Sequence, residues 1–321
     1  MSLAPRVISE VAHRGDVAIE VVFGPLALRL PILGSPMPDV CGTEMARALA
    51  RHGALGILHR FDSIESQAAA YREASTGSGA GKGCVGAAVG VSGDYQQRFA
   101  ALYEAGCRVI CLDTANGAHR QVAAAIQWVK RQHGDVFILA GNVATKEGFK
   151  WLEDEGADAI RVGIAGGSVC ETRNETGVYV PTPYAVAEAA SVRKRALIIG
   201  DGGVRMPADL AKLLALGADV VMLGSALAGT REALGRVIVV DGKRFKIMRG
   251  AASFSVQQEA AGSRPQYVEG AETLVPYKGR VEEVLQRYEA GLRSSLSYLN
   301  ARTLADFRQN AAFVEISPIA P

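Results

Sequence analysis

The sequence carries almost no excess of either charge. Among its 321 residues, 35 are basic and 33 are acidic, which leaves a formal net charge of +2. The charges are spread along the chain, without a basic cluster or an acidic tail. Nucleic-acid-binding domains concentrate lysine and arginine on one face, so this balance argues against a nucleic-acid partner.

Cysteine is scarce, and long apolar runs are absent. The cysteines are odd in number, with no CxxC pair and no histidine pair at zinc-ligand spacing; they are Cys41, Cys84, Cys107, Cys111 and Cys170. This argues against a disulfide framework and a structural metal, and it fits a reducing cytoplasm. No run approaches the roughly 20 apolar residues that span a membrane, and residues 1–16 lack the apolar core of a signal peptide. We expect a cytoplasmic protein without a membrane partner.

Short apolar runs recur along the chain at fairly even intervals. They are continuous rather than alternating, as expected for parallel strands that are buried on both faces. The predicted strands are residues 31–37, 55–60, 84–90, 108–114, 137–143, 159–163, 196–202 and 220–225. Eight such strands in a chain of this length favour a single (β/α)8 barrel over an open, doubly wound sheet.

Helical segments lie between these runs, and four of them close on a glycine. Residues 43–53, 95–106, 149–156 and 207–217 end at Gly53, Gly106, Gly156 and Gly217, which suit a left-handed helix cap. Barrel enzymes place their active sites at the carboxyl ends of the strands. The candidate functional residues are therefore those at the strand ends: Met37, Arg60, Asp113, Asn116, Asn142, Gly163, Asp201 and Ser225.

Residues 226–279 do not follow the strand-helix rhythm. They contain VVDGKR, a turn between two strands, and then the polar segment QQEAAGSRPQYVEGAE, before a closing helix over 281–299. We predict one barrel domain over 1–321, in which 226–279 is an insertion that carries a short mobile flap. The alternative is a disordered surface segment without a role.

Three glycine-rich strand ends follow one another late in the chain. They are residues 166–168, residues 201–203, and Gly224 with Ser225. Exposed backbone N–H groups in such loops commonly bind phosphate in this fold, and Asp201 could accept hydrogen bonds from ribose hydroxyls. Cys170 lies beside this cradle, so it is either a nucleophile or a small buried side chain. Together these features suggest a nucleotide ligand.

Several motifs resemble the inosine monophosphate (IMP) dehydrogenase and guanosine monophosphate (GMP) reductase family. These are GIAGGSVCETRNETGV, IIGDGGVRMPADLAKLLALGADVVMLGSALAGT, LDTANG, AGNVAT, VPYKG and GLRSSLSYL, and the resemblance runs from about residue 31 to 317. It implies a (β/α)8 barrel, usually a homotetramer, that binds a purine nucleotide beside a nicotinamide cofactor. It also implies that Cys170 attacks a purine ring carbon.

The same resemblance implies the remaining site residues. Predicted substrate contacts are Ser168, Asp201, Gly202, Gly203, Gly224, Ser225, Arg249, Gly250, Gly270 and Glu269, the last of which reads the base edge. Predicted cofactor contacts are Asp113, Thr114, Asn116, Asn142 and Arg161. Family members also hold potassium with carbonyl oxygens of the cysteine loop. Ala165 in place of glycine makes that loop less permissive, so we predict no metal ligand residues and leave K+ open.

Four features favour the reductase branch of the family. Dehydrogenases carry an adjacent Arg-Tyr pair that activates water, whereas Arg264 and Tyr267 are separated here by two residues. Asn116 and the tail SSLSYLNA also look reductase-like, and the regulatory cystathionine-synthase-type (CBS) insert of many dehydrogenases is missing. The expected cofactor is therefore NADPH rather than NAD.

The catalytic glutamate of the reductases falls on Phe254, although Thr172 occupies the matching threonine position. We therefore expect Cys170, Thr172 and a displaced carboxylate, Glu171, to be the catalytic residues. The predicted activity is hydride transfer to carbon 6 of GMP or a close guanine nucleotide analogue, in a purine-modifying pathway, with a product that need not be IMP. Alternatives are an ordinary GMP reductase that makes IMP and ammonia, an NAD-dependent IMP dehydrogenase, and a non-catalytic nucleotide-binding paralogue.

Overall fold

Eight parallel strands close into a barrel, as the sequence predicts. A computed structural model of the chain describes residues 1–76, 85–261 and 267–316, so Cys84 and Arg264 lie outside the described residues. Around the barrel the order is β10-β11-β4-β5-β6-β7-β8-β9. The bounds are β4 (Ile32–Gly34), β5 (Leu55–Leu58), β6 (Val85–Val89), β7 (Val109–Asp113), β8 (Phe137–Val143), β9 (Ala159–Val162), β10 (Leu197–Asp201) and β11 (Val220–Leu223).

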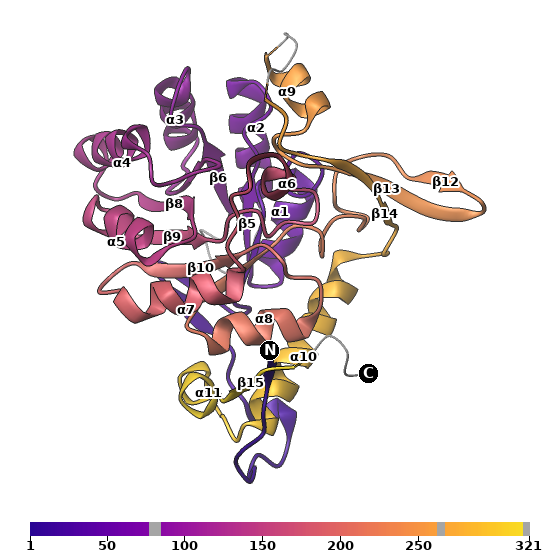
Figure 1. Cartoon of the computed structure of the whole chain (residues 1–321). Helices are drawn as coiled ribbons and strands as arrows, with labels where there is room; N and C mark the ends of the chain where they lie inside the picture. The colour runs from indigo at the N-terminus through magenta and orange to yellow at the C-terminus, as the bar shows by residue number, and fades with distance from the viewer. Residues whose placement is uncertain (77–84, 262–266, 317–321) are drawn as a thin grey trace.

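Helices pack around the outside of the barrel (Figure 1). Seven of them connect consecutive strands, and α10 follows the insertion after β11. They are α1 (Thr43–Arg51), α2 (Ile64–Ser75), α3 (Tyr95–Glu104), α4 (Arg120–Gln132), α5 (Lys146–Asp154), α7 (Thr182–Val192), α8 (Pro207–Ala215) and α10 (Val281–Tyr298). This alternation confirms the (β/α)8 class and brings the loops after the strands together at one end.

The four predicted glycine caps adopt positive φ. The angles are 71° at Gly53, 97° at Gly106, 101° at Gly156 and 112° at Gly217. A side chain is disfavoured at such angles, so glycine lets each chain segment leave its helix and enter the next strand within two or three residues. The helix-cap-strand pattern of the sequence therefore has a direct backbone cause.

Short elements cover the amino-terminal end of the barrel. A hairpin of β2 (Val21–Phe23) and β3 (Leu26–Leu28) places Phe23 edge-on to Phe137, with 5.3 Å between ring centroids, where β8 begins. The remaining small elements are η1 (Arg14–Asp16), α11 (Leu304–Asn310), and β1 (Ser2–Leu3), which pairs with β15 (Phe313–Val314). Within the described chain, no helix has the length and apolar character needed to cross a membrane.

The insertion after β11 forms a small antiparallel sheet outside the barrel. Its strands are β12 (Ile238–Val240), β13 (Lys243–Arg249) and β14 (Glu272–Pro276), and Figure 1 shows the β12-β13 hairpin projecting from the molecule. Asp241 and Gly242 both have positive φ, as a two-residue hairpin turn requires. Helix α9 (Phe254–Ala261) follows β13. The predicted turn is confirmed, and the mobile flap stays a prediction.

Candidate active site

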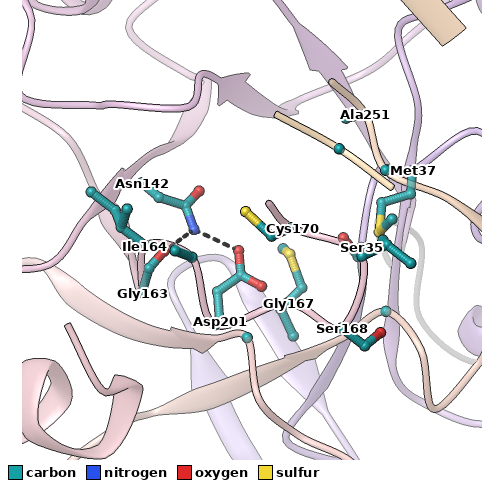
Figure 2. A pocket seen from close by; sticks show the side chains of 18 of the residues that line it. Ser35, Met37, Asn142, Gly163, Ile164, Gly167, Ser168, Cys170, Asp201 and Ala251 are labelled. Atoms are coloured by element: carbon teal, nitrogen blue, oxygen red, sulfur yellow. Dashed lines mark hydrogen bonds between the residues drawn. The ribbon is translucent and has the colours of Figure 1, made fainter. Parts of the chain in front are cut away.

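A cavity of about 280 Å³ opens at the carboxyl ends of the barrel strands. Cys170 and Asp201 point into it (Figure 2). Its lining includes most of the predicted site residues: Asp113, Thr114, Asn142, Arg161, Ser168, Cys170, Thr172, Asp201, Gly202, Gly203, Gly224, Ser225, Gly250, Glu269 and Gly270. Loops far apart in sequence therefore meet at one site.

The loops after β9 and β10 pack backbone against backbone. A Cβ atom on Gly163, whose φ is 145°, would lie 1.8 Å from the carbonyl oxygen of Asp201. A Cβ atom on Gly202 would lie 3.1 Å from the carbonyl carbon of Gly166. This close approach needs glycine at both places, and it leaves no side chains between the backbone N–H groups and a bound anion.

Ala165 adopts φ 60° within the same loop. An alanine in the left-handed region is strained, and such strain concentrates at functional sites. The loop thus takes the conformation that we expected alanine to disfavour.

No metal site is formed by side chains in the part of the chain that the structure describes. There, no group of three or more His, Cys, Asp or Glu side chains is placed to hold a metal ion.

Asp201 is anchored through one of its two carboxylate oxygens. Its Oδ2 atom accepts hydrogen bonds from Asn142 Nδ2 at 2.8 Å, Arg161 Nη2 at 2.9 Å and Arg161 Nε at 3.1 Å. No described residue donates to Oδ1, and Asp201 lines the cavity (Figure 2). The carboxylate is therefore held rigidly with one oxygen available to a ligand hydroxyl.

Arg161 forms the charged floor of the site. Its buried guanidinium also donates to Asp113 Oδ1 at 2.7 Å. Burial opposes its charge, but Asp201, Cys111 and Asp113 together raise the pKa of Arg161 well above its usual value. Burial likewise opposes ionisation of Asp113, yet Arg161 and Arg60 hold the pKa of that carboxyl below its ordinary value. The floor of the cavity is thus a fixed network of charged groups. The side chains of Arg161 and Asn142 both donate hydrogen bonds within this network.

Cys170 begins a chain of hydrogen bonds that ends on a carboxylate. Its Sγ donates to Thr172 Oγ1 at 3.3 Å, and Thr172 Oγ1 donates to Glu269 Oε2 at 2.7 Å. The backbones of the two segments are also paired, because Glu171 N donates to Glu269 O at 2.7 Å and Cys170 forms a β-bridge with Gly270. The segment after α9 is therefore fastened to the cysteine loop.

The other described cysteines differ from Cys170 in their surroundings. Cys41, Cys107 and Cys111 are buried, whereas Cys170 is partly exposed. Burial raises the pKa of Cys41 and of Cys107 to about 12, and that of Cys111 to about 11. A neutral, enclosed thiol is a poor nucleophile, so among the described cysteines Cys170 is the one placed for chemistry.

The structure places Glu171 away from the cavity lining. Its carboxylate accepts a hydrogen bond from Asn174 Nδ2 at 2.5 Å, at the start of α6 (Thr172–Thr176). Phe254 is also outside the lining, 42% exposed, as the first residue of α9. The carboxylate that contacts Thr172 is that of Glu269. The two residues are far apart in the sequence, so the sequence alone did not predict this contact.

Arg249, a predicted substrate contact, does not line the cavity. Its Nε donates to Asp39 Oδ2 at 2.8 Å, its Nη2 to Asp39 Oδ1 at 3.0 Å, and its Nη1 to Glu259 at 2.8 Å. The hydrogen bonds that Arg249 donates to Asp39 raise the pKa of Arg249 above its usual value. The pair fixes β13 to the loop after β4, which brings Met248 and Gly250 to the cavity.

Asn116 is likewise absent from the lining, and its Oδ1 accepts from the backbone N–H of Ala118. Other residues line the cavity without an assigned role: Ser35, Met37, Arg60, Arg205, Met222 and Met248. Of these, Met37 and Arg60 end predicted strands and are among the strand-end candidates of the sequence analysis. Met248 and Arg205 lie in loops or in the insertion, where periodicity carries no signal of a site.

Comparison with known proteins agrees with this geometry. A family model described as the IMP dehydrogenase / GMP reductase domain matches residues 1–320. The chain belongs to the IMP dehydrogenase / GMP reductase family. Its fold and its cysteine loop are therefore those of a family member.

Similar curated proteins are named inosine-5'-monophosphate dehydrogenases. The one from Aquifex aeolicus is 42% identical over 243 residues, which are 73% of this chain and 50% of that protein. The one from Bacillus subtilis is 39% identical over 248 residues, 74% of this chain and 50% of that protein. The one from Borreliella burgdorferi is 31% identical over 375 residues, 99% of this chain and 93% of that protein. The chain spans about half the length of the first relatives that it matches.

Proposed function

We propose that this family member is an NADPH-dependent reductase of GMP or a close guanine nucleotide, with Cys170 as its nucleophile. The observation that carries the proposal is the hydrogen-bonded chain from Cys170 through Thr172 to Glu269. It joins a partly exposed thiol to a carboxylate through a hydroxyl group, an arrangement that can move protons at the carbon where sulfur bonds.

The chemistry of guanine places the reaction at carbon 2 rather than at the expected carbon 6. The amino group of guanine is carried by carbon 2, whereas carbon 6 carries the oxo oxygen. A thiolate that displaces ammonia must therefore bond to carbon 2. The balanced reaction is GMP + NADPH + 2 H⁺ giving IMP + NADP⁺ + NH₄⁺. When bound, the nicotinamide supplies the hydride that replaces sulfur at carbon 2.

Phe254 occupies the position of the catalytic glutamate of the reductases, but Glu269 supplies a carboxylate next to Thr172. The Cys170 thiol gives up its proton when its sulfur bonds to carbon 2, and the departing amino group gains one. Thr172 lies between the two partners and can relay these protons to and from Glu269. Such general acid-base assistance is typically worth about 10²–10⁴ in rate. We therefore propose that ammonia is released, which favours IMP over a dihydro-purine product.

The rest of the cavity fits a nucleotide beside a nicotinamide cofactor. Ser168, Gly203 and Gly224 lie in the loops after β9, β10 and β11, where backbone N–H groups suit a phosphate. The free Oδ1 of Asp201 suits a ribose hydroxyl. The same cavity continues to Asp113 and Thr114 at the end of β7, which would hold the nicotinamide end of the cofactor.

The names of the relatives favour a second candidate, NAD-dependent oxidation of IMP. That reaction uses the same thiol at carbon 2, but it ends in hydrolysis and needs a group that activates water. The non-adjacent Arg264 and Tyr267 of the sequence weigh against it.

By resemblance we also propose a cytoplasmic homotetramer. Light scattering of the purified protein would test the homotetramer.

The experiment is a comparison of the two directions with the same protein. We expect GMP with NADPH to give oxidation of the cofactor, ammonia, and a product with the mass of IMP. Cys170→Ser should abolish this turnover while nucleotide binding persists. Reduction of NAD⁺ with IMP, without NADPH consumption with any guanine nucleotide, would assign the chain to the second candidate. Binding without turnover in either direction would indicate a non-catalytic paralogue.

A further inference from the structure

Arg60 is a cation in the cavity wall to which no role has been assigned. It follows β5 after the buried His59, and its side chain lines the cavity while remaining 34% exposed. A charged side chain at the end of a barrel strand is placed to meet a ligand.

Only one nitrogen of the Arg60 guanidinium is engaged. Its Nε donates to Asp113 Oδ2 at 3.3 Å, and its guanidinium carbon lies 4.9 Å from the centre of the Phe61 ring. Asp113 is itself held from the other side by Arg161. Within the described residues, neither Nη1 nor Nη2 of Arg60 has a hydrogen-bond acceptor. The side chain is thus held through Nε and the Phe61 ring, and Nη1 and Nη2 are available to a ligand.

The strand order shows on which side of the cavity Arg60 lies. The phosphate cradle lies after β9, β10 and β11, whereas β5 stands four strands from β9 on either path around the closed barrel. Arg60 is therefore across the barrel from the Cys170 loop. A nucleotide seated on the cradle with its base at Cys170 leaves the β5 to β7 side to the second ligand.

We propose that Arg60 binds the diphosphate of the nicotinamide dinucleotide; this rests on the function proposed above. An arginine fork matches two oxygens of a phosphate, and Asp113 engages only Nε of Arg60, so Nη1 and Nη2 can both donate to the diphosphate. Phe61 and Asp113 hold the guanidinium in place before the ligand arrives, so little side-chain freedom is lost on binding.

The test measures binding rather than turnover. Cys170→Ser protein saturated with IMP is titrated with NADP⁺ and, separately, with 2'-phospho-ADP-ribose, which retains the diphosphate and lacks nicotinamide. We expect Arg60→Met to weaken both ligands by about 10- to 100-fold, the range for a charge-assisted hydrogen bond. Arg60→Lys, which keeps the charge and loses the fork, should fall between. Arg47→Met, which removes an ion-paired arginine of similar exposure outside the cavity lining, should leave both affinities unchanged.

Three results would overturn the assignment of Arg60. Unchanged affinity for both ligands in Arg60→Met and Arg60→Lys would make Arg60 only a structural partner of Asp113. Weaker binding of NADP⁺ alone would place Arg60 on the nicotinamide. Weaker binding of IMP would place it on the substrate. If the protein with Arg60 intact binds neither NADP⁺ nor 2'-phospho-ADP-ribose, the proposed function itself fails, and the Arg60 assignment fails with it.

Discussion

The Thr172 hydroxyl donates a 2.7 Å hydrogen bond to the carboxylate of Glu269, 97 residues further along the chain. This bond joins the cysteine loop of the barrel to the segment that precedes β14. It is supported by backbone pairing on both sides, including Ala271 N to Val169 O at 2.8 Å. The insertion therefore carries the carboxylate that we propose as the proton-handling group, and its position depends on this pairing with the cysteine loop.

Glu269→Gln should lower kcat by about 10²–10⁴, because an amide can accept the Thr172 hydrogen bond but cannot take or return a proton. Steady-state rates of the variant and the wild type would measure this loss. Glu175→Gln, an exposed change on α6, is the matched control. A rise in KM at unchanged kcat would instead limit Glu269 to reading the base.

Thiol labelling should separate Cys170 from the other described cysteines. Burial raises the pKa of Cys41 and Cys107 to about 12 and of Cys111 to about 11, so these thiols stay neutral and enclosed at pH 8. Iodoacetamide should therefore modify Cys170 in the folded protein and stop turnover, and GMP should protect it. Peptide mass spectrometry identifies the modified residue. Labelling of Cys111 before Cys170 would contradict this order.

The barrel was predictable because its signal is local and repeated. Most strands are continuous apolar runs, and each of four helices is followed by a glycine that the structure shows at positive φ, as at Gly53 and Gly217. The meeting of the glycine-rich loops at one cavity was predictable for the same reason, because Ser168, Gly203 and Gly224 each follow a strand. The closed fold then brings all strand ends to one face.

The partnerships of charged side chains were not predictable in this way. Arg249 was expected at the substrate, but it pairs with Asp39, 210 residues away. Glu171 was expected to replace a missing carboxylate because it adjoins Cys170, yet neighbours in a short turn point in different directions. Hydrogen-bond partners depend on loop geometry, which periodicity does not encode. A single sequence therefore predicted which loops meet at the cavity, but it did not predict the hydrogen-bond partners of Arg249 and Glu171.

Gly163→Ala should distort the backbone of the loops after β9 and β10. Its new Cβ would meet the Asp201 carbonyl oxygen at 1.8 Å, and backbone cannot yield as a flexible side chain can. We expect destabilisation of about 1–3 kcal/mol or more, together with loss of nucleotide binding. Urea denaturation and a binding titration would measure the two effects. Gly134→Ala, where a Cβ meets nothing within 4 Å, should alter neither; unimpaired binding in Gly163→Ala would refute the close packing of the loops.

The Asp39–Arg249 pair should contribute to both stability and activity. Asp39 is only 5% exposed, so removing its partner leaves a carboxylate in the interior. We expect Arg249→Met to lower the free energy of unfolding by about 3 kcal/mol. It should also reduce turnover, because β13 carries Met248 at the cavity. In a double-mutant cycle with Asp39→Ala, strictly additive losses would show that the two side chains do not interact.

Asp113 should give the protein a stability term that is lost in acid. Burial opposes its ionisation, but Arg161 and Arg60 outweigh burial and hold the pKa of the folded-state carboxyl below its ordinary value. A carboxyl with a depressed pKa stabilises the fold fully above the unfolded-state pKa of about 3.9 and loses that contribution as the pH falls through the lower, folded value. The difference in free energy of unfolding between the wild type and Asp113→Asn should therefore be constant from pH 7 to about 5 and shrink below about pH 4. Urea denaturation at a series of pH values measures it. A difference that stays constant down to pH 3 would mean that Asp113 does not draw its stabilising effect from the two arginines, and the fixed orientation of Arg60 would then need another cause.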